Sequence, residues 1–329
     1  MAAVAVVGAG VAGLTAAFRL KQRGVRVVLY EAGDRAGGAV LTERRDGYLA
    51  ELGPNSIAGP SPRTRSLFSD LGLGESLLAA SPKARHRFVV RKGKLLPLPT
   101  SPSQLLTTRL LSNSAKLAVF GEPMVDAGDS PMEESIGGFI RRRFNQEVLD
   151  YVGNPFVTGV FAGDPEQLSV RHALPRLHAL ERSHGSVIKA FAAKSCTRPD
   201  PKTGASPSDG LFSFRGGLQE LSGALAREAG TALRLKAPVT QIRRGPKGWT
   251  VDAAYQATEL YDGVVYAAPA HCADEIEFGF EGGERLKTLT SIPHPPVGVL
   301  SLGFRAEDVT HPLDGFGFLV PEVERRQVL

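Results

Sequence analysis

The 329-residue sequence contains little cysteine, methionine or tryptophan: two, three and one residues respectively. The two cysteines, Cys196 and Cys272, are far apart in the sequence and form no C-x-x-C pair. We therefore expect neither a disulfide framework nor a cysteine-based zinc site. The seven histidines show no H-E-x-x-H spacing, so we expect no metal site. No run of 18 apolar residues predicts a transmembrane helix, and no basic segment predicts a signal peptide.

The charge balance is also unremarkable, with a net charge of +5. An excess of this size does not point to nucleic acid, and it suits an anionic substrate or an anionic membrane surface. The composition, 42% hydrophobic and 22% charged, is that of a globular protein large enough for two domains. We expect a bacterial cytoplasmic protein with no nucleic-acid partner. Peripheral attachment to the cytoplasmic membrane is an alternative that the composition also allows.

The first 31 residues carry the strongest local pattern. Val4–Val7 predicts a buried strand, Leu14–Gln22 a helix, and Val25–Tyr30 a second strand that ends at Glu31. The glycines between strand and helix follow the pattern G-x-G-x-x-G. In such a βαβ unit they permit a tight turn, close approach of a pyrophosphate and close helix packing. A terminal acid 18 residues later is placed to accept ribose hydroxyls. The segment therefore predicts a dinucleotide-binding unit.

The residues after Glu31 indicate which dinucleotide the protein binds. They continue as E-x3-R-x-G-G, with Arg35 and a glycine pair. This pattern resembles flavoproteins of the amine oxidase and phytoene desaturase type, and the resemblance implies FAD as the cofactor. It implies FAD contacts at Gly8, Ala9, Gly10, Val11, Ala12, Gly13, Glu31, Ala32, Arg35, Gly37, Gly38, Ala39, Gly53, Pro54, Asn55, Ser56 and Val239.

The rest of the chain predicts an α/β fold in which a discontinuous Rossmann-like FAD-binding domain carries an inserted α+β substrate domain. We expect residues 1–82 and 210–275 to form the FAD domain, and 83–195 to be mainly helical and to contact substrate. The basic hairpin over residues 85–97 turns at Gly93. Residues 196–209 predict a flexible loop, and 276–329 predict strands of the substrate domain, including 297–305 and 315–320. The apolar stretch after Ser103 fits either core helices or a monotopic membrane contact.

Several longer runs resemble the oxygen-dependent protoporphyrinogen oxidase family. They include F-A-G-D-P-E-Q-L-S at 161–169 and G-F-G-F-L-V-P at 315–321, and the likeness covers nearly the whole chain. The resemblance implies that Arg87 pairs with a substrate propionate, with Arg85 and His86 as neighbours able to share the task. It also implies that the Gly163 carbonyl meets a pyrrole N–H and that Leu319 contacts the tetrapyrrole ring.

The same resemblance implies an enzyme that aromatises protoporphyrinogen IX, with FAD as cofactor and dioxygen as electron acceptor. No catalytic side chain is assigned, because the flavin carries the chemistry. The first alternative is a coproporphyrinogen III oxidase. The further alternatives are an amine oxidase or carotenoid desaturase, and an inactive, truncated flavoprotein. A homodimer is also expected from the resemblance.

The family pattern closes with a further strand and a helix that contact FAD, and neither follows Gln327–Leu329 here. The sequence therefore leads us to expect a chain cut at its C-terminus that binds FAD weakly.

Overall fold

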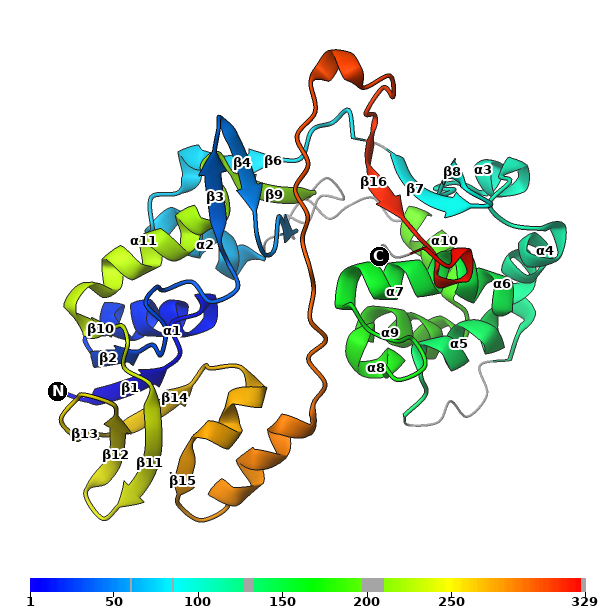
Figure 1. The fold of residues 1–329 in the computed structure, drawn as a ribbon. Helices are drawn as coiled ribbons and strands as arrows, with labels where there is room; N and C mark the ends of the chain where they lie inside the picture. The colour runs from blue at the N-terminus through cyan, green and yellow to red at the C-terminus, as the bar shows by residue number, and fades with distance from the viewer. Residues whose placement is uncertain (60, 85, 127–132, 197–209, 327–329) are drawn as a thin grey trace. The chain divides into compact units, whose positions relative to one another are not determined.

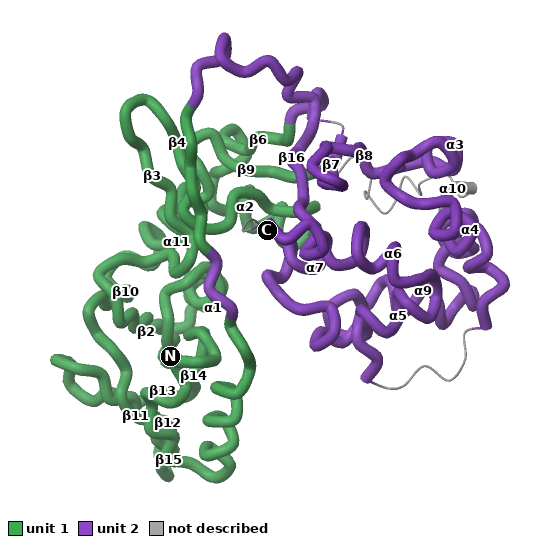
Figure 2. The backbone as a smooth tube through the Cα atoms, turned by 45° about the vertical axis from the view of Figure 1, so that its right-hand side comes forward, with its two compact units in different colours: residues 1–80, 207–294, 298–303 green, residues 81–206, 295–297, 304–329 purple. Residues whose placement is uncertain are grey.

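The computed structural model describes residues 1–59, 61–84, 86–126, 133–196 and 210–326. It divides the chain into two compact units, shown in Figure 2. Unit 1 holds residues 1–80, 207–294 and 298–303, and unit 2 holds residues 81–206, 295–297 and 304–329. Unit 1 is therefore built from separate stretches of sequence.

A parallel sheet in the order β10-β2-β1-β14 forms the middle of unit 1 (Figure 1). Its strands are β1 (Ala3–Val7), β2 (Arg26–Tyr30), β10 (Leu233–Arg234) and β14 (Gly263–Tyr266). Alanine and valine fill β1, and β2 is buried and hydrophobic from Val27 to Tyr30, as expected for strands covered on both faces. Alternate side chains enter two different cores, because successive residues of a strand point to opposite faces.

Helices cover one face of this sheet. They are α1 (Val11–Gln22), α2 (Pro62–Asp70) and α11 (Gln219–Ala229). Leu14 and Phe18 of α1, Phe68 of α2 and Leu225 of α11 share one buried cluster with Val6 of β1. The apolar face of each helix thus packs on the sheet, and the turn that precedes α1 is held at the carboxyl end of β1.

A second sheet, β13-β12-β11-β15, covers the other face. Its strands are β11 (Val239–Gly245), β12 (Gly248–Ala253), β13 (Glu259–Tyr261) and β15 (Glu277–Gly279). Unit 1 also contains the hairpin β3 (Thr42–Arg45) and β4 (Tyr48–Glu51), and a sheet of β5 (Ile57–Ala58), β9 (Leu211–Phe214) and β6 (Leu77–Ala79). Its 3-10 turns are η1 (Gly74–Ser76), η4 (Gly230–Ala232), η5 (Ala270–Glu275) and η6 (Gly283–Ser291).

Unit 2 is mainly helical in its described part. The helices are α3 (Pro102–Thr107), α4 (Asn113–Gly121), α5 (Ile136–Arg143), α6 (Gln146–Val148), α7 (Asn154–Phe161), α8 (Val170–Ala173), α9 (Pro175–His184) and α10 (Val187–Cys196). A π-helical turn, η3 (Leu149–Gly153), joins α6 to α7, and the 3-10 turns are η2 (Glu122–Met124), η7 (Ala306–Asp308) and η8 (Glu322–Glu324). Phe139 and Ile136 of α5 lie at the centre of the helical core with Val157 of α7.

A three-stranded sheet, β16-β7-β8, completes unit 2. β7 (His86–Arg91) and β8 (Lys94–Pro97) form the predicted basic hairpin, and Lys92 and Gly93 at its turn both have positive φ. β16 (Gly315–Leu319), which follows more than 200 residues later, pairs with β7 in parallel. This pairing brings the G-F-G run beside the basic hairpin.

Three expectations need correction. Residues 297–305 form no strand, because none of their backbone N–H groups finds a backbone partner among the described residues, and a strand needs a ladder. The run 233–235, whose sequence predicts the first strand of a meander with 237–242 and 249–251, instead pairs as β10 with β2 in the parallel sheet. The boundary expected at residue 276 lies later, because β15 pairs with β11 and residues 276–294 belong to unit 1.

The expected loop at 196–209 falls almost wholly outside the described residues; its first residue, Cys196, ends α10. Within the described part of the chain, none of the helices is long and apolar enough to cross a membrane.

Candidate functional site

The glycine turn between β1 and α1 leaves open space at a helix N-terminus. Gly8 has a φ of +98°, and a Cβ there would lie 2.8 Å from the Ala268 nitrogen. A Cβ on Gly13 would lie 1.9 Å from the Gly8 carbonyl oxygen, so this glycine lets α1 pack on the turn. At Gly10, the N-cap of α1, a Cβ would meet nothing within 4 Å. Such a space, faced by the first turn of the helix, suits a pyrophosphate.

Glu31 holds the glycine turn from the end of β2. Its Oε2 accepts a hydrogen bond from the Ala9 N–H at 2.7 Å, and its Oε1 accepts one from the Gly33 N–H at 2.9 Å. A carboxylate oxygen can accept more than one hydrogen bond, so the predicted ribose contact is compatible with these two. The sequence predicts only a ribose ligand, whereas the structure also gives Glu31 a backbone-holding role.

The Arg35 loop lies against the same turn. The Gly37 N–H donates to the Ala9 carbonyl at 2.8 Å, and a Cβ on Gly38 would lie 3.1 Å from the Gly10 Cα. The Arg35 guanidinium donates to the carbonyls of Gly38 at 2.7 Å and Val40 at 3.2 Å. Arg35 therefore shapes the loop that carries the glycine pair, and its donors point to backbone.

Gly53 continues this surface, because a Cβ there would lie 2.0 Å from the Ala39 carbonyl oxygen. Pro54 and Asn55 follow as exposed residues, and the Ser56 hydroxyl donates to Asn55 Oδ1 at 2.9 Å. The structure thus places Gly53 directly against the Arg35 loop. The flavin contacts of 53–56 stay a prediction.

Backbone hydrogen bonds join residues 31–33, which include Ala32, to residues 236–237, just before Val239. The Lys236 N–H donates to the Gly33 carbonyl at 2.8 Å, and the Ala237 N–H donates to the Glu31 carbonyl at 2.9 Å. Ala32 is exposed between these anchors, and Val239 begins β11 with 8% of its surface exposed. The predicted adenine-contacting segment therefore lies beside the predicted ribose ligand.

The structure also reveals a polar cluster that the sequence analysis missed. The Glu51 carboxylate accepts from the Leu218 N–H and from the Thr42 hydroxyl, both at 2.7 Å. Thr42 Oγ1 accepts from the Gln219 N–H at 3.1 Å, and Gln219 Oε1 accepts from the Thr42 N–H at 2.9 Å. These bonds cap the first turn of α11, and a Cβ on Gly217 would lie within 2.3–2.8 Å of Thr42 and Glu51.

In unit 2, the sheet brings Arg87 and Leu319 to one face. Arg87 is paired with Gly317 and Val89 with Leu319, and aligned residues of parallel strands point to the same side. The exposed Arg87 guanidinium lies 6.0 Å from the centre of the Phe316 ring. A cation and an apolar side chain thus share one surface on β7 and β16. Arg85 lies outside the described residues.

The opposite face of this sheet carries a different set of side chains. His86 faces Phe88, with ring centres 5.8 Å apart, and its Nε2 lies 3.8 Å from Asp314 Oδ2. His86 alternates with Arg87 along β7, so the two side chains do not share a surface. The structure therefore separates His86 from Arg87, which it was expected to assist.

Gly163 comes near this surface through α7. Leu319 packs on that helix, since a Cβ on Gly159 would lie 2.8 Å from Leu319 Cδ2. Ala162 ends α7 in a left-handed conformation, and Gly163 follows it. Asp164 Oδ1 accepts from the Glu166 N–H at 2.8 Å, and Glu166 pairs with Arg141 at 2.5 and 2.6 Å. The F-A-G-D-P-E run is thus built to fix the loop that carries Gly163.

The residues of unit 1 fit FAD. The open space at Gly10 has room for a group such as a diphosphate, the Glu31 carboxylate has acceptor capacity that a ribose could use, and the Val239 segment offers backbone beside it. Across the described ranges, no three His, Cys, Asp or Glu side chains are grouped to hold a metal ion.

Comparison with known proteins agrees with this geometry. The model of the family "Flavin containing amine oxidoreductase" matches residues 11–325. Protoporphyrinogen oxidase 2 of Arabidopsis thaliana is 35% identical, over 98% of this chain and 68% of its own length. Coproporphyrinogen III oxidase of Staphylococcus aureus is 29% identical, over 96% of this chain and 70% of its own length. The resemblance inferred from the sequence motifs is confirmed.

Solved structures show the same fold. An Exiguobacterium protein provisionally named a protoporphyrinogen oxidase aligns with a TM-score of 0.67 and 25% identity, over 82% of this chain and 60% of that one. The cyclohexylamine oxidase of Brevibacterium oxydans aligns with a TM-score of 0.59 and 20% identity, over 88% of this chain and 63% of its own. This chain thus spans less than two thirds of these solved structures.

Proposed function

Because the chain belongs to the flavin-containing amine oxidoreductase family, we propose that it serves the FAD-dependent oxidation of protoporphyrinogen IX to protoporphyrin IX. The observation that carries the proposal is the shared face of Arg87 and Leu319 on β7 and β16. A porphyrinogen has an apolar ring system and propionate groups, and this surface offers one partner for each. A guanidinium can bind a carboxylate through two parallel hydrogen bonds.

The two units divide the work. When bound, FAD would supply the hydride acceptor for the aromatisation, which removes six electrons from the substrate in three two-electron oxidations. The glycine turn and Glu31 hold the cofactor through its diphosphate and ribose. Arg87 fixes the substrate by a propionate, Leu319 covers the ring, and the Gly163 carbonyl accepts a pyrrole N–H. These residues bind and orient the substrate, and none of them takes part in the redox step itself.

Partners complete the proposal. Dioxygen is the acceptor that reoxidises the cofactor, and a second copy of the chain forms a homodimer. Anaerobic assay without any other electron acceptor tests the first statement, and sedimentation velocity tests the second. Turnover unchanged by removal of oxygen, or a monomer at all concentrations, would contradict the respective statement.

Coproporphyrinogen III is the second candidate substrate, favoured by the coproporphyrinogen III oxidases among the relatives. It carries four propionates, and the hairpin that holds Arg87 also offers the exposed residues Lys92 and Lys94. Comparison of kcat/KM for the two porphyrinogens, from porphyrin fluorescence under air with added FAD, decides between them. An amine or polyene substrate is indicated if flavin binds but neither porphyrinogen is oxidised.

The test residue is Arg87. We expect Arg87→Ala to raise KM for the preferred porphyrinogen by about tenfold or more, because a charge-assisted pair contributes about 1.5–3 kcal/mol. Arg176→Ala is the matched control, since it removes one exposed guanidinium from α9 in the same unit, and it should leave KM within about twofold. An equal effect of both variants would contradict a specific propionate contact.

A peripheral membrane contact of unit 2 is a further part of the proposal. Leu106 of α3, Leu117 and Phe120 of α4, and Met124 of η2 are between 44% and 93% exposed. Exposed apolar side chains on neighbouring short helices suit a lipid interface. Flotation with anionic vesicles should carry the protein upwards, and Leu117→Glu should abolish this. Flotation that the variant leaves unchanged would contradict the assignment.

A further inference from the structure

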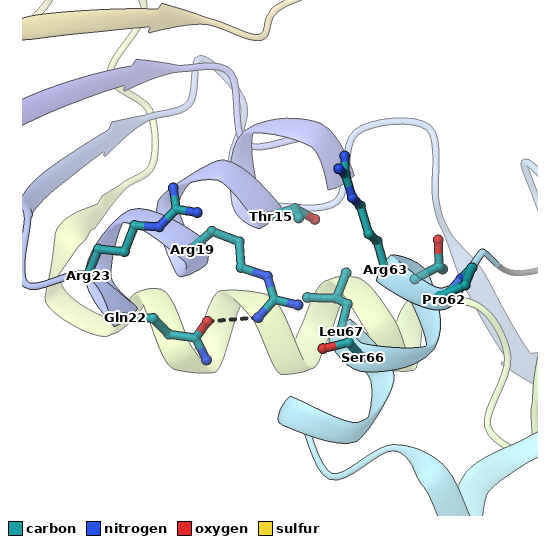
Figure 3. A pocket seen from close by; sticks show the side chains of 9 residues that line it. Thr15, Arg19, Gln22, Arg23, Pro62, Arg63, Ser66 and Leu67 are labelled. Atoms are coloured by element: carbon teal, nitrogen blue, oxygen red, sulfur yellow. Dashed lines mark hydrogen bonds between the residues drawn. The ribbon is translucent and has the colours of Figure 1, made fainter.

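A separate hollow of about 900 Å³ lies between α1 and α2 in unit 1 (Figure 3). Its lining is rich in arginine and hydroxyl groups and is made by Thr15, Arg19, Gln22, Arg23, Pro62, Arg63, Thr64, Ser66 and Leu67. Thr15, Arg19, Gln22 and Arg23 recur at helical spacing, so they occupy one face of α1. The hollow therefore combines three guanidinium groups from two helices with a small apolar wall.

The positive charge of this hollow is only partly balanced. Arg19 is paired with Asp70 at 2.5 Å and also donates to Gln22 Oε1 at 2.7 Å. Within the described ranges, the guanidinium groups of Arg23 and Arg63 have no hydrogen-bond or ion-pair partner. The planar guanidinium group of arginine matches the geometry of carboxylate and phosphate groups. Arg23 and Arg63 contribute two such groups to the lining of the hollow. The Gln22 amide adds a neutral donor, because only its oxygen is used by Arg19.

The hydroxyl of Thr15 gives an independent indication. Some hydroxyl side chains in helices of this protein bond back to the preceding turn, as Thr158 does to the Asn154 carbonyl at 2.7 Å and Ser183 to the Ala179 carbonyl at 2.8 Å, whereas Ser66 of the hollow donates to Asp70 Oδ2 at 3.3 Å. Thr15 makes no such bond in the described structure, and its hydroxyl faces the hollow. A donor turned away from its own helix is available to a ligand.

We propose that this hollow is a binding site for a multivalent anion, a small molecule with two or more carboxylate or phosphate groups. Arg23 and Arg63 bind the anionic groups, Thr15 and Gln22 donate additional hydrogen bonds, and Arg19 is held in place by Asp70. The site is distinct from the cofactor cradle. Gly10 and Arg23 are at opposite ends of α1, about 20 Å apart at 1.5 Å per residue.

Isothermal titration with citrate and with inorganic pyrophosphate, at low ionic strength and with saturating FAD to occupy the cofactor cradle, tests the site. We expect one or both to bind with a stoichiometry of one at the hollow. The double variant Arg23→Ser/Arg63→Ser should weaken that binding by about tenfold or more, because charge-assisted hydrogen bonds are lost. The tighter probe shows whether carboxylate or phosphate is preferred.

Arg44→Ser/Arg45→Ser is the matched control, since it removes the same charge from exposed positions on β3. It should change the affinity by less than about twofold. Thr15→Val keeps the side-chain shape and should weaken binding several-fold even if the double arginine variant fails to fold. The proposal is overturned if neither probe binds, if both double variants weaken binding equally, or if Thr15→Val binds as tightly as the parent.

Discussion

Gly10 and Gly13 lie three residues apart in one motif, yet a methyl group would meet very different surroundings at each. At Gly13 it would lie 1.9 Å from a backbone oxygen, and at Gly10 it would meet nothing within 4 Å. Gly13 is therefore required by the fold of the protein, whereas Gly10 leaves room for a ligand. Single substitutions can separate these roles.

We expect Gly13→Ala to destabilise unit 1 by about 1–3 kcal/mol or more, because the added methyl group forces helix and turn apart. Gly10→Ala should leave the melting temperature nearly unchanged and weaken FAD binding, because its methyl group fills the diphosphate space. Thermal unfolding and titration of flavin fluorescence measure the two effects. Parental FAD affinity in Gly10→Ala would show that the diphosphate lies elsewhere.

Glu31 provides a second prediction at this scale. Glu31→Gln places an NH2 group opposite the N–H of Ala9 or Gly33, so one hydrogen bond is replaced by a donor facing a donor. A loss of about 1–3 kcal/mol in the free energy of unfolding is expected, with weaker FAD binding. Asp34→Asn, an exposed neighbour, is the control for charge and should have little effect. Equal stability of the two variants in urea unfolding would refute the backbone role.

The residue scale also shows where the sequence suffices. The spacing of the glycines and of Glu31 predicted the cofactor class, because that motif is local and its geometry follows from one βαβ unit. The bond from Ala9 to Glu31 joins residues 22 positions apart, and the pattern alone does not reveal it. Thr42 and Glu51 were missed for the same reason, since their partners on α11 are 167 to 177 residues away.

At the scale of elements, capping explains several of these long-range bonds. A helix is predicted from sequence when its N-cap is local, as Ser61 is for α2. The residues before α11 are glycines and a leucine, so its cap comes from the β3–β4 hairpin. Residues 297–305 illustrate the opposite error, because their alternating apolar pattern predicted a strand that has no ladder partner among the described residues.

The α10 helix shows the energetic weight of such a cap. Glu122 is fully buried, accepts from the Ser186 hydroxyl at 2.5 Å and from the N–H groups of Val187 and Ile188, and pairs with the buried Arg143. Burial alone would raise the pKa of Glu122, but these hydrogen bonds outweigh it and lower the pKa below its ordinary value. A carboxyl group with a lowered pKa stabilises the fold above its unfolded-state pKa, and this stabilisation is lost as the pH falls towards the folded-state pKa.

We therefore expect unit 2 to lose stability as the pH drops through the ordinary carboxyl range. Glu122→Gln should cost about 1–3 kcal/mol at neutral pH, because it removes hydrogen bonds to the carboxylate and leaves Arg143 with only Glu181, 3.5 Å away, as its counter-charge, and it should reduce the acid dependence. Arg141 lies on α5, as Arg143 does, and forms an exposed ion pair with Glu166. Glu166→Gln breaks that pair and should cost less than about 1 kcal/mol. Helix content followed by circular dichroism in urea at several pH values gives both numbers. If the free energy of unfolding of Glu122→Gln falls with decreasing pH as steeply as that of the parent, the pH dependence comes from other groups.

At the scale of the whole molecule, two compact units with separate cores imply two unfolding reactions. The predicted cofactor ligands lie in unit 1, and the buried Glu122–Arg143 pair lies in unit 2. Trp249 is the single tryptophan of the sequence and lies on β12 of unit 1, with its ring centre 5.0 Å from that of Phe280. Its fluorescence therefore reports on unit 1 alone, whereas the helical signal is dominated by unit 2.

FAD should shift these two reactions unequally. A ligand that binds only the folded state adds about 2.7 kcal/mol at 100 times its Kd, so the Trp249 transition should move to higher urea as FAD is added. The helical transition should stay in place, and Glu122→Gln should move that transition while leaving the Trp249 signal unchanged. Gly10→Ala is the control, since its Trp249 transition should respond little to FAD. If FAD or Glu122→Gln moves both transitions together, the two units unfold as one cooperative structure, and the cofactor stabilises the substrate-binding surface as well as its own cradle.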